Sequence, residues 1–529
     1  MPDWWWSIFR FDKWGNWLLN EPGLNTKPTA TGLRIRRGGL LAGACLAMLP
    51  AGCTFRNGPK FAPTAAVGDL PTRWTSGDGA PEQSVTGWLD DFGSPSLRRL
   101  VEEAVGANYN LAAARSRIFQ ARERGRIVGA DRLPAIDSSL ATTRSQSLRG
   151  SEFANTRANN FNFSLDLSWE IDLWGRLKNL RDAELDRVAT ESGLYEASRL
   201  SLAANVIKTA LSIVEAREQI GISRRTLSSL QTNLKILNSR MEAGDLAEQA
   251  ALEISLSRAD IARAERAILL SQRRMDGARR TLETLLGRYP AGTVESIGGL
   301  PRISRDIPKG IPSELLLRRP DLLAAEAQVD AAMKELSASR KALLPSLSIN
   351  GMIGTASTDE FGDLFDIQHM VWAVGQNLAR PLYQGGRLRA NIRLDEAERD
   401  ELVNQYAETA LTAFREVETA LAAERFLKSE VAALSTAVEE SRRAEQLSLG
   451  EFEQGLVEII TLLESQRRAF EAESVLLAAR YELLANRVDL YLALGGDFDH
   501  PPLPREPLPE AAAKERKADA EAAKPEGQR

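Results

Sequence analysis

Residues 161–173 of this chain read FNFSLDLSWEIDL, and apolar side chains alternate with polar ones along the whole stretch. Because successive side chains of a β-strand point to opposite faces of a sheet, the pattern predicts a strand with one apolar and one polar face. A strand of roughly 10 residues or more, with aromatics in its apolar set, is long enough to cross an outer membrane within a barrel. A soluble amphipathic strand has the same pattern, so this stretch alone leaves both interpretations open.

The composition excludes several function classes. The 529 residues carry a formal net charge of −5, whereas nucleic-acid binding needs a basic patch. There are two cysteines and two histidines, so we expect no disulfide framework and no multi-cysteine metal site in the folded body. Metalloprotease, P-loop and nucleophile-elbow motifs are absent from the sequence, and no pair of carboxylates stands out as catalytic. We therefore expect no enzyme activity, no cofactor and no nucleic-acid partner.

The N-terminal region has the features of a lipoprotein signal. Arginines among residues 34–37 precede a short apolar run at residues 38–52, the order found in secretory signals. The run ends in LPAGC (residues 49–53), which resembles a bacterial lipobox and predicts lipidation at Cys53. Cys45 is a weaker candidate, and a buried free cysteine is the alternative. Thr54 follows Cys53, and lipoproteins without Asp at that position are usually sent to the outer membrane.

The chain contains an internal duplication with a fixed offset. Equivalent landmarks are 211 positions apart (345 − 134), namely Pro134 and Pro345, Gly175 and Gly386, and Gly244 and Gly455. Several landmarks with one offset predict a domain duplication. Each half is expected to begin with a helix (residues 94–132 and 313–343) that ends before a proline. Two strands should follow in each half, at residues 136–143 and 160–173, and at residues 346–353 and 370–378.

Very long helices are predicted after these strands. No proline occurs between Pro134 and Pro290 or between Pro381 and Pro501. Apolar residues of the second long segment keep a spacing of three and four, interrupted only at Glu424, which is typical of a coiled-coil seam. Sixty helical residues span roughly 90 Å at 1.5 Å per residue, more than a globular domain needs. The glycines at 244 and 455 are expected to mark the tips of two helical hairpins.

These features divide the chain into six expected segments. They are an N-terminal extension and lipoprotein signal (1–52), a lipid-anchored extended arm (53–87), repeat 1 (88–288), a linker (289–312), repeat 2 (313–498) and a disordered tail (499–529). Each repeat would consist of a helix, two strands and a long helical hairpin. The fold class expected is therefore an α+β membrane protein.

Several motifs together resemble those of the TolC-type outer-membrane factors, in particular their lipidated efflux branch (OprM/NodT-like). The motifs are LRRPD (317–321), FEQGL (452–456), PLYQGGR (381–387), SWEIDLWGR (168–176) and LYLALGG (490–496), with GPKFAP (58–63) in the arm. The resemblance covers about residues 53–498. It implies a homotrimer in which four strands per chain form one 12-stranded β-barrel, continuous with a periplasmic α-helical coiled-coil barrel. Trimerisation would also remove the sheet edges that lipid does not tolerate.

The resemblance also implies functional residues. Ile460, Glu464 and Arg467 would line a periplasmic aperture, and their spacing places them on one helix face. An ordinary intrahelical ion pair is the alternative for Glu464 and Arg467. The hairpin tips would dock a periplasmic adaptor (membrane fusion) protein through Arg240, Gly244, Leu246, Glu451, Gly455 and Val457.

The implied function is an exit duct in the outer membrane of a Gram-negative bacterium. The duct would serve a tripartite efflux pump, with an inner-membrane transporter of the RND type, and would passively export small toxic compounds or drugs. One alternative is a duct for type I protein secretion. Another alternative is a lipid-anchored periplasmic coiled-coil tether without a pore. A protein of this kind would have no membrane strands.

Overall fold

The computed structural model describes residues 61–68, 71, 73–76, 88–149, 154–242, 250–295, 297–302 and 312–496. All of them belong to one compact unit, residues 57–529. The predicted lipidation site Cys53, the tip residues Gly244 and Leu246, and the predicted tail (499–529) lie outside the described residues.

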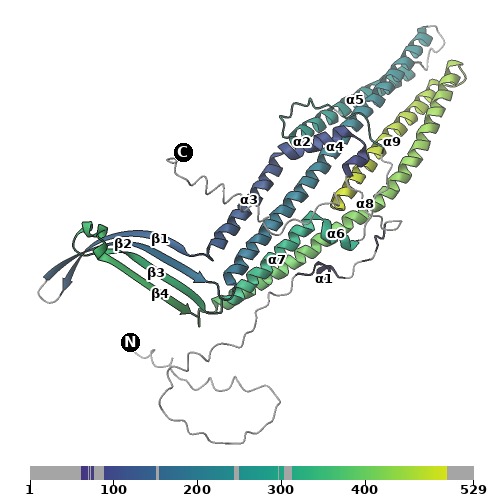
Figure 1. Cartoon of the computed structure of the whole chain (residues 1–529). Helices are drawn as coiled ribbons and strands as arrows, with labels where there is room; N and C mark the ends of the chain where they lie inside the picture. The colour runs from purple at the N-terminus through teal and green to yellow at the C-terminus, as the bar shows by residue number, and fades with distance from the viewer. Residues whose placement is uncertain are drawn as a thin grey trace, which may run out of the picture. The chain divides into compact units, whose positions relative to one another are not determined.

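The first half of the described chain contains most of the elements predicted for it (Figure 1). They are α1 (Pro63–Val67), η1 (Trp88–Phe92), α2 (Pro95–Ala107), α3 (Tyr109–Ala130), β1 (Ala135–Arg149), β2 (Ala154–Ile171), α4 (Arg176–Glu242) and α5 (Ala250–Leu285). The second half repeats this order with α6 (Pro312–Arg318), α7 (Pro320–Lys341), β3 (Ser346–Ser357), η2 (Phe361–Phe365), η3 (Ile367–His369), β4 (Met370–Ala379), α8 (Arg387–Glu453) and α9 (Ile459–Ala493). The long helices α4 and α8 each have 67 residues, and their first residues are 211 positions apart (387 − 176).

Two helices predicted as continuous are broken. The expected helix at 94–132 is α2 and α3, because the Asn108 side chain accepts hydrogen bonds from the backbone N–H groups of Asn110 and Leu111 at 3.0 and 3.1 Å. Such a cap begins a new helix. The expected helix at 313–343 is α6 and α7, because Pro320 occupies the first turn of α7 and excludes Arg319 from helical geometry.

The sheet is an antiparallel meander in the order β1-β2-β3-β4. The strands β1 and β2 are longer than predicted, because they remain paired beyond the amphipathic stretch, out to Arg149 opposite Ala154. Backbone pairing of this kind does not require apolar side chains. The first and last strands, β1 and β4, each have one edge that is not paired with another strand of the described residues.

The register assigns every side chain to one face of the sheet. Directly opposed residues share a face, as Leu165 does with Ile353, and Ile353 with Trp372. By this rule most of the large apolar residues of the four strands lie on the same face, namely Ile136, Leu140, Phe161, Phe163, Leu165, Leu167, Trp169, Ile171, Leu347, Ile349, Ile353, Met370, Trp372, Val374 and Leu378, whereas Met352 and Val371 lie on the opposite face. The amphipathic strand predicted at 160–173 therefore has the two faces expected of it, but it ends at Ile171, because the Asp172 carboxylate accepts hydrogen bonds from the backbone N–H groups of Leu177 and Lys178 at the start of α4.

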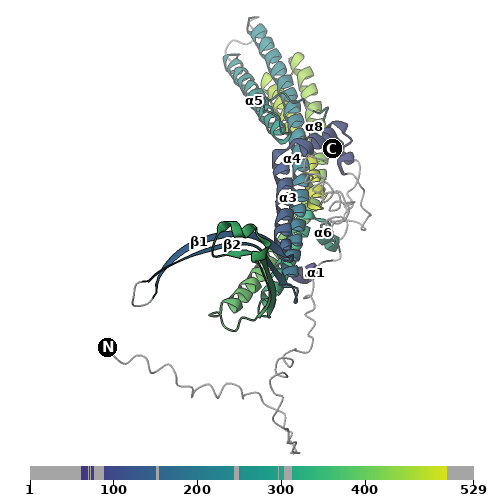
Figure 2. The same cartoon turned by 60° about the vertical axis from the view of Figure 1, so that its left-hand side comes forward.

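Two sets of four helices lie side by side within this unit (Figures 1 and 2). Near the sheet the order of contacts is α3–α4–α7–α8, and toward the hairpin tips it is α5–α4–α9–α8. The start of α7 meets the end of α9, where Arg319 donates a hydrogen bond to the carbonyl of Ala493 at 3.2 Å. Among the described residues, no helix is both long enough and apolar enough to span a membrane.

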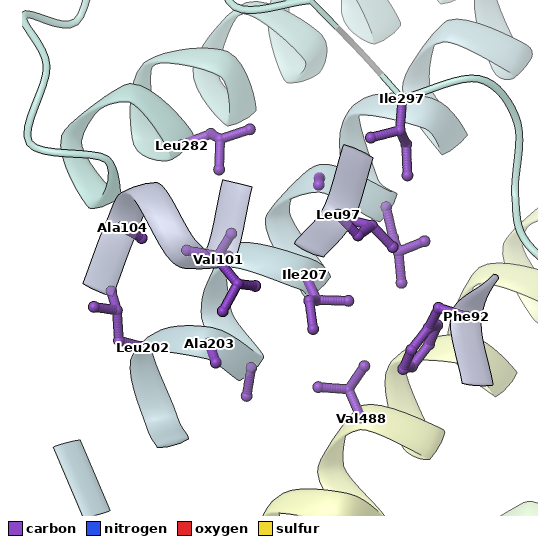
Figure 3. Packing of buried hydrophobic residues seen from close by; sticks show 14 of the residues in the cluster. Phe92, Leu97, Val101, Ala104, Leu202, Ala203, Ile207, Leu282, Ile297 and Val488 are labelled. Atoms are coloured by element: carbon purple, nitrogen blue, oxygen red, sulfur yellow. The ribbon is translucent and has the colours of Figure 1, made fainter. Parts of the chain in front are cut away.

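The hydrophobic core is largest where the short helices cover the long ones. Figure 3 shows Leu97 and Val101 of α2 packed with Ile207 of α4, while Val488 of α9 and Phe92 of η1 complete the cluster. In α8 the predicted coiled-coil seam is buried over much of its length at Tyr406, Ala410, Ala413, Val417, Ala420 and Val438. Alanine in this seam allows close approach of the neighbouring helices.

Candidate functional site

The two faces of the sheet have opposite chemistry. On the polar face the Ser139 and Ser164 hydroxyls lie 2.9 Å apart, and Ser164 donates a hydrogen bond to Asp166 at 2.8 Å. On the apolar face Trp372 and Val374 are 70% and 74% exposed in the single chain. Ile136, Leu140 and Ile353 on the same face are exposed as well, and a contiguous apolar patch of this kind marks contact with lipid or protein, whereas the polar network suits contact with water. The sheet can therefore separate lipid from water.

The junction between sheet and helices is fixed by two indole groups. Trp169 donates a hydrogen bond to the carbonyl of Arg132 at 3.0 Å, and Trp174 donates one to the carbonyl of Pro345 at 2.7 Å. Gly175 adopts a left-handed conformation (φ 73°), which permits the sharp turn from strand into α4. Indoles with one polar and one apolar side are typical of membrane–water interfaces, so the positions of these tryptophans agree with an aromatic girdle.

The second hairpin tip is a tight helical turn at the predicted glycine. Helix α8 ends at Glu453, Gly455 has φ 75°, and the N–H of Leu456 donates a hydrogen bond to the carbonyl of Glu451 at 2.9 Å. Glu451 is exposed and Val457 is half-buried. In the first hairpin, Arg240 lies in the last turns of α4, shortly before the part of the tip that is not described.

The two hairpins are packed together near their tips. Five buried apolar residues from four helices form one cluster there, namely Leu237, Ile254, Phe452, Ile459 and Leu462. Glu253 of α5 is buried beside them, and burial raises its pKa, as does the nearby carboxylate of Glu458. The tip region thus combines an apolar contact with a carboxyl group whose charged form is disfavoured.

The predicted aperture residues lie together on the exposed side of α9. Ile460 is 49% exposed, and Arg467 donates hydrogen bonds to both carboxylate oxygens of Glu464 at 2.8 and 2.9 Å. Arg468 donates another to Glu464 at 2.7 Å. The guanidinium groups of Arg467 and Arg468 lower the pKa of Glu464 to about 2. Within one chain Glu464 is therefore held as a carboxylate between two cations.

Arg468 was not among the residues singled out from the sequence. Its position four residues after Glu464 is the signal that could have identified it, since side chains at this spacing are neighbours on a helix. Arg467 also donates to Glu471 at 3.1 Å, so the charges form a small network along α9 and not an isolated pair.

The interface between α4 and α9 contains a buried polar layer that the sequence pattern did not reveal. Gln466 is only 2% exposed; it accepts a hydrogen bond from Asn233 at 2.7 Å and donates one to Ser229 at 2.9 Å. Farther from the tip Gln219 donates to Ser474 at 2.9 Å. The two hairpins are thus joined by side-chain hydrogen bonds as well as by the apolar cluster.

The family model described as "Outer membrane efflux protein" matches residues 100–288 and 311–496. The pyoverdine export outer membrane protein OpmQ of Pseudomonas putida is 32% identical over 443 residues, which cover 81% of this chain and 92% of that protein. The outer membrane protein OprJ of Pseudomonas aeruginosa is 34% identical over 417 residues, covering 78% and 86%. The structure of the outer-membrane channel OprN matches with a TM-score of 0.77 at 25% identity, over 83% of this chain and 98% of that one.

Proposed function

Since this chain belongs to the outer membrane efflux protein family, we infer that it is the outer-membrane exit duct of a tripartite efflux pump. The observation that carries this conclusion is the four-stranded sheet with one apolar face, one polar face and two open edges. Four strands cannot close a barrel, and open edges are not tolerated in lipid. Three copies, each pairing β4 with β1 of the next, remove every edge and enclose a polar lumen.

Transport through the duct is passive. The chain has no nucleotide-binding motif, and the family is one of channels and not of enzymes. Channels of this family form homotrimers that work with adaptor proteins and inner-membrane pumps, so the driving energy comes from the pump. The structural alternative of a coiled-coil tether without membrane strands is wrong, because the sheet and the family match both indicate a channel.

The substrate class is that of small toxic compounds or drugs, and the inner-membrane partner is of the RND type. Sequence similarity to the outer-membrane proteins named above supports both assignments, since one of them is the pyoverdine export protein OpmQ. Lipidation at Cys53 would anchor the chain to the outer membrane and would leave its helices in the periplasm. Type I secretion remains the alternative, because a duct of this shape does not itself select cargo.

The aperture lies at Ile460, Glu464 and Arg467. Three copies around the axis would place an apolar, an acidic and a basic ring close together, and such rings gate ions in narrow pores. The shared solvent-facing side of these three residues on α9 supports this assignment. The hydrogen bonds between Arg467 and Glu464 do not distinguish it from the intrahelical ion pair named as the alternative. Opening would separate α9 from α4, and this motion would break the hydrogen bonds that Gln466 makes with Asn233 and Ser229.

The adaptor would dock on the hairpin tips, at Arg240, Gly244, Leu246, Glu451, Gly455 and Val457. The exposed turn at Gly455 and the apolar cluster below it support a surface that is rigid enough for hairpin-to-hairpin packing.

The function is tested by deleting the gene in the organism that carries it and measuring accumulation of ethidium. We expect accumulation to rise, and a plasmid copy of the wild-type gene to restore export. Unchanged accumulation of every small pump substrate, together with loss of a secreted protein, would instead establish the type I secretion alternative.

A further inference from the structure

The connection between β3 and β4 folds onto the apolar face of the sheet. In Figures 1 and 2 its short green helical turns lie against the sheet near the end farthest from the long helices. The register gives the face: Thr355 is opposite Phe163, and Ser357 is opposite Phe161, so both hydroxyl side chains belong to the apolar face. Both of them contact η2, which therefore covers that face and not the polar one.

Three contacts hold η2 in this place. Thr355 donates a hydrogen bond to the carbonyl of Leu364 at 2.8 Å, and Ser357 donates one to the Asp363 carboxylate at 2.6 Å. The rings of Phe161 and Phe361 meet edge to face, with centroids 5.8 Å apart. The two hydroxyl groups that would otherwise face lipid are thereby satisfied by the loop itself.

The connection is an ordered structure and not an open loop. Leu364 is buried (7% exposed), and Glu360 with Asp363 forms a capping box at the start of η2. Asp366 accepts a hydrogen bond from the N–H of Gln368 at 3.0 Å, which fixes the start of η3. The ordered backbone of η2 and η3 therefore fixes the side of the segment from which each of its other side chains projects.

Large apolar side chains project outward from this ordered segment. Phe365 is 84% exposed and Ile367 is 78% exposed, while Phe361 is 45% exposed and contacts Phe365 with ring centroids 6.2 Å apart. The segment packs on β2 and β3, the two inner strands of the sheet. Neighbouring copies in a trimer would add at the outer edges of β1 and β4, whereas η2, with Phe361 and Phe365, lies over the inner strands.

We propose that η2 and η3 form a membrane-interface anchor, in which Phe361, Phe365 and Ile367 contact the acyl chains of the outer leaflet. Phe361 and Phe365 continue the lipid-facing surface outward from Phe161, with successive ring centroids 5.8 and 6.2 Å apart, while the Asp363 carboxylate beside them is hydrogen-bonded to Ser357. Aromatic side chains gather at this level of membrane barrels. The acidic residues Asp359, Glu360 and Asp366 of the same segment are exposed, and in this arrangement their carboxylates would face the headgroups and water. The anchor fixes the depth at which the barrel rests in the membrane.

This inference rests on the proposed function, because it requires the sheet to lie in a membrane. It is tested with single-cysteine additions in the full-length trimer, reconstituted in phospholipid vesicles and labelled with a nitroxide. The additions are Phe365→Cys and Ile367→Cys, with Asp359→Cys as the control for water and Val374→Cys as the control for lipid. Labelled wild type gives the background from the native cysteines, and heat-modifiable trimers confirm that each variant assembles.

The readout is the accessibility of each label to oxygen, which partitions into lipid, relative to that of a water-soluble nickel chelate. We expect this ratio to be severalfold higher at positions 365 and 367 than at 359, and to approach the ratio at 374. A lipid-exposed label at 374 together with water-exposed labels at 365 and 367 would overturn the anchor and leave the duct intact. Water exposure at all four positions would overturn the proposed function as well.

Discussion

Glu424 of α8 and Arg487 of α9 form an ion pair that is buried between these two helices. The Arg487 side chain is 3% exposed and that of Glu424 is 11% exposed. Lys428, one turn farther along α8, also contacts the Glu424 carboxylate at 3.3 Å. Glu424 interrupts the apolar seam of α8 in the sequence. Its charge is therefore paired with Arg487 of α9, the other helix of the same hairpin.

The first prediction concerns this pair. Replacement Glu424→Gln removes the carboxylate that faces a buried guanidinium, and breaking a buried pair in this way costs about 3–5 kcal/mol. We expect a matching loss of stability in urea unfolding of the purified trimer, followed by circular dichroism. The double replacement Glu424→Leu with Arg487→Met should recover most of that loss, since an apolar pair carries no desolvation cost.

The exposed pair Asp260–Arg263 of α5 provides the control for this measurement. Arg263 is 77% exposed, so Asp260→Asn should change the stability by no more than about 1 kcal/mol. Equal effects of Asp260→Asn and Glu424→Gln would contradict the assignment of a buried pair.

The second prediction concerns close approach of two strands in the sheet. A Cβ atom at Gly354 would overlap the backbone carbonyl of Phe163 on β2, whereas a Cβ atom at Gly375 on β4 would meet nothing within 4 Å. Backbone atoms within a paired ladder cannot move aside, so Gly354→Ala should abolish most heat-modifiable trimer in outer-membrane fractions. Gly375→Ala should leave the trimer yield close to that of wild type. Normal assembly of both variants would show that the approach at Gly354 is not required.

The third prediction concerns the aperture. Combining Glu464→Ala with Arg467→Ala removes the acidic and basic rings and should raise single-channel conductance in planar bilayers severalfold. Glu123→Ala with Arg126→Ala removes an exposed pair of the same spacing on α3 and should leave conductance unchanged. Unchanged conductance in the aperture variant would show that the constriction lies elsewhere.

The fourth prediction concerns pH. The two arginines lower the pKa of Glu464 to about 2, so folding favours the carboxylate. At this group the folded state binds fewer protons than the unfolded state does. The ion pairs of Glu464 with the two arginines therefore persist at every pH above the ordinary carboxyl range and are lost only as the pH falls toward 2. The difference in conductance between wild type and Glu464→Gln should therefore be constant from about pH 8 to about pH 5. A change in that difference centred within this range would mean that Glu464 is not held between the two arginines.

The elements with a strong repeat were the ones that the sequence predicted well. The alternation at 161–173 has one polarity on each face, and the glycine at 455 ends α8, as expected from its conformational freedom. The duplication predicted one long helix at the equivalent position of each half, and α4 and α8 are equal in length. Hydrophobic periodicity and glycine positions are local signals, so they can be read from a single sequence without knowledge of distant contacts.

Features that depend on contacts distant in sequence were not predicted. The break at Asn108 is stabilised partly by a hydrogen bond that its side chain donates to the carbonyl of Leu285, 177 residues away. The partner of Glu424 lies 63 residues away in sequence, and nothing in the seam indicates it. The short helices η2 and η3 between β3 and β4 were not predicted, because their fixed structure depends on hydroxyl groups of β3. The aperture and docking residues stay predictions, resting on the resemblance and on their placement.

The central claim is that three copies of this chain enclose one water-filled passage through lipid. Its most direct test is to reconstitute the purified protein in liposomes loaded with a small fluorescent solute, and to determine its subunit number by native mass spectrometry. We predict a trimer that releases solute, slowly in the wild type and faster in the aperture variant. A monomer that releases no solute in either form would contradict the claim.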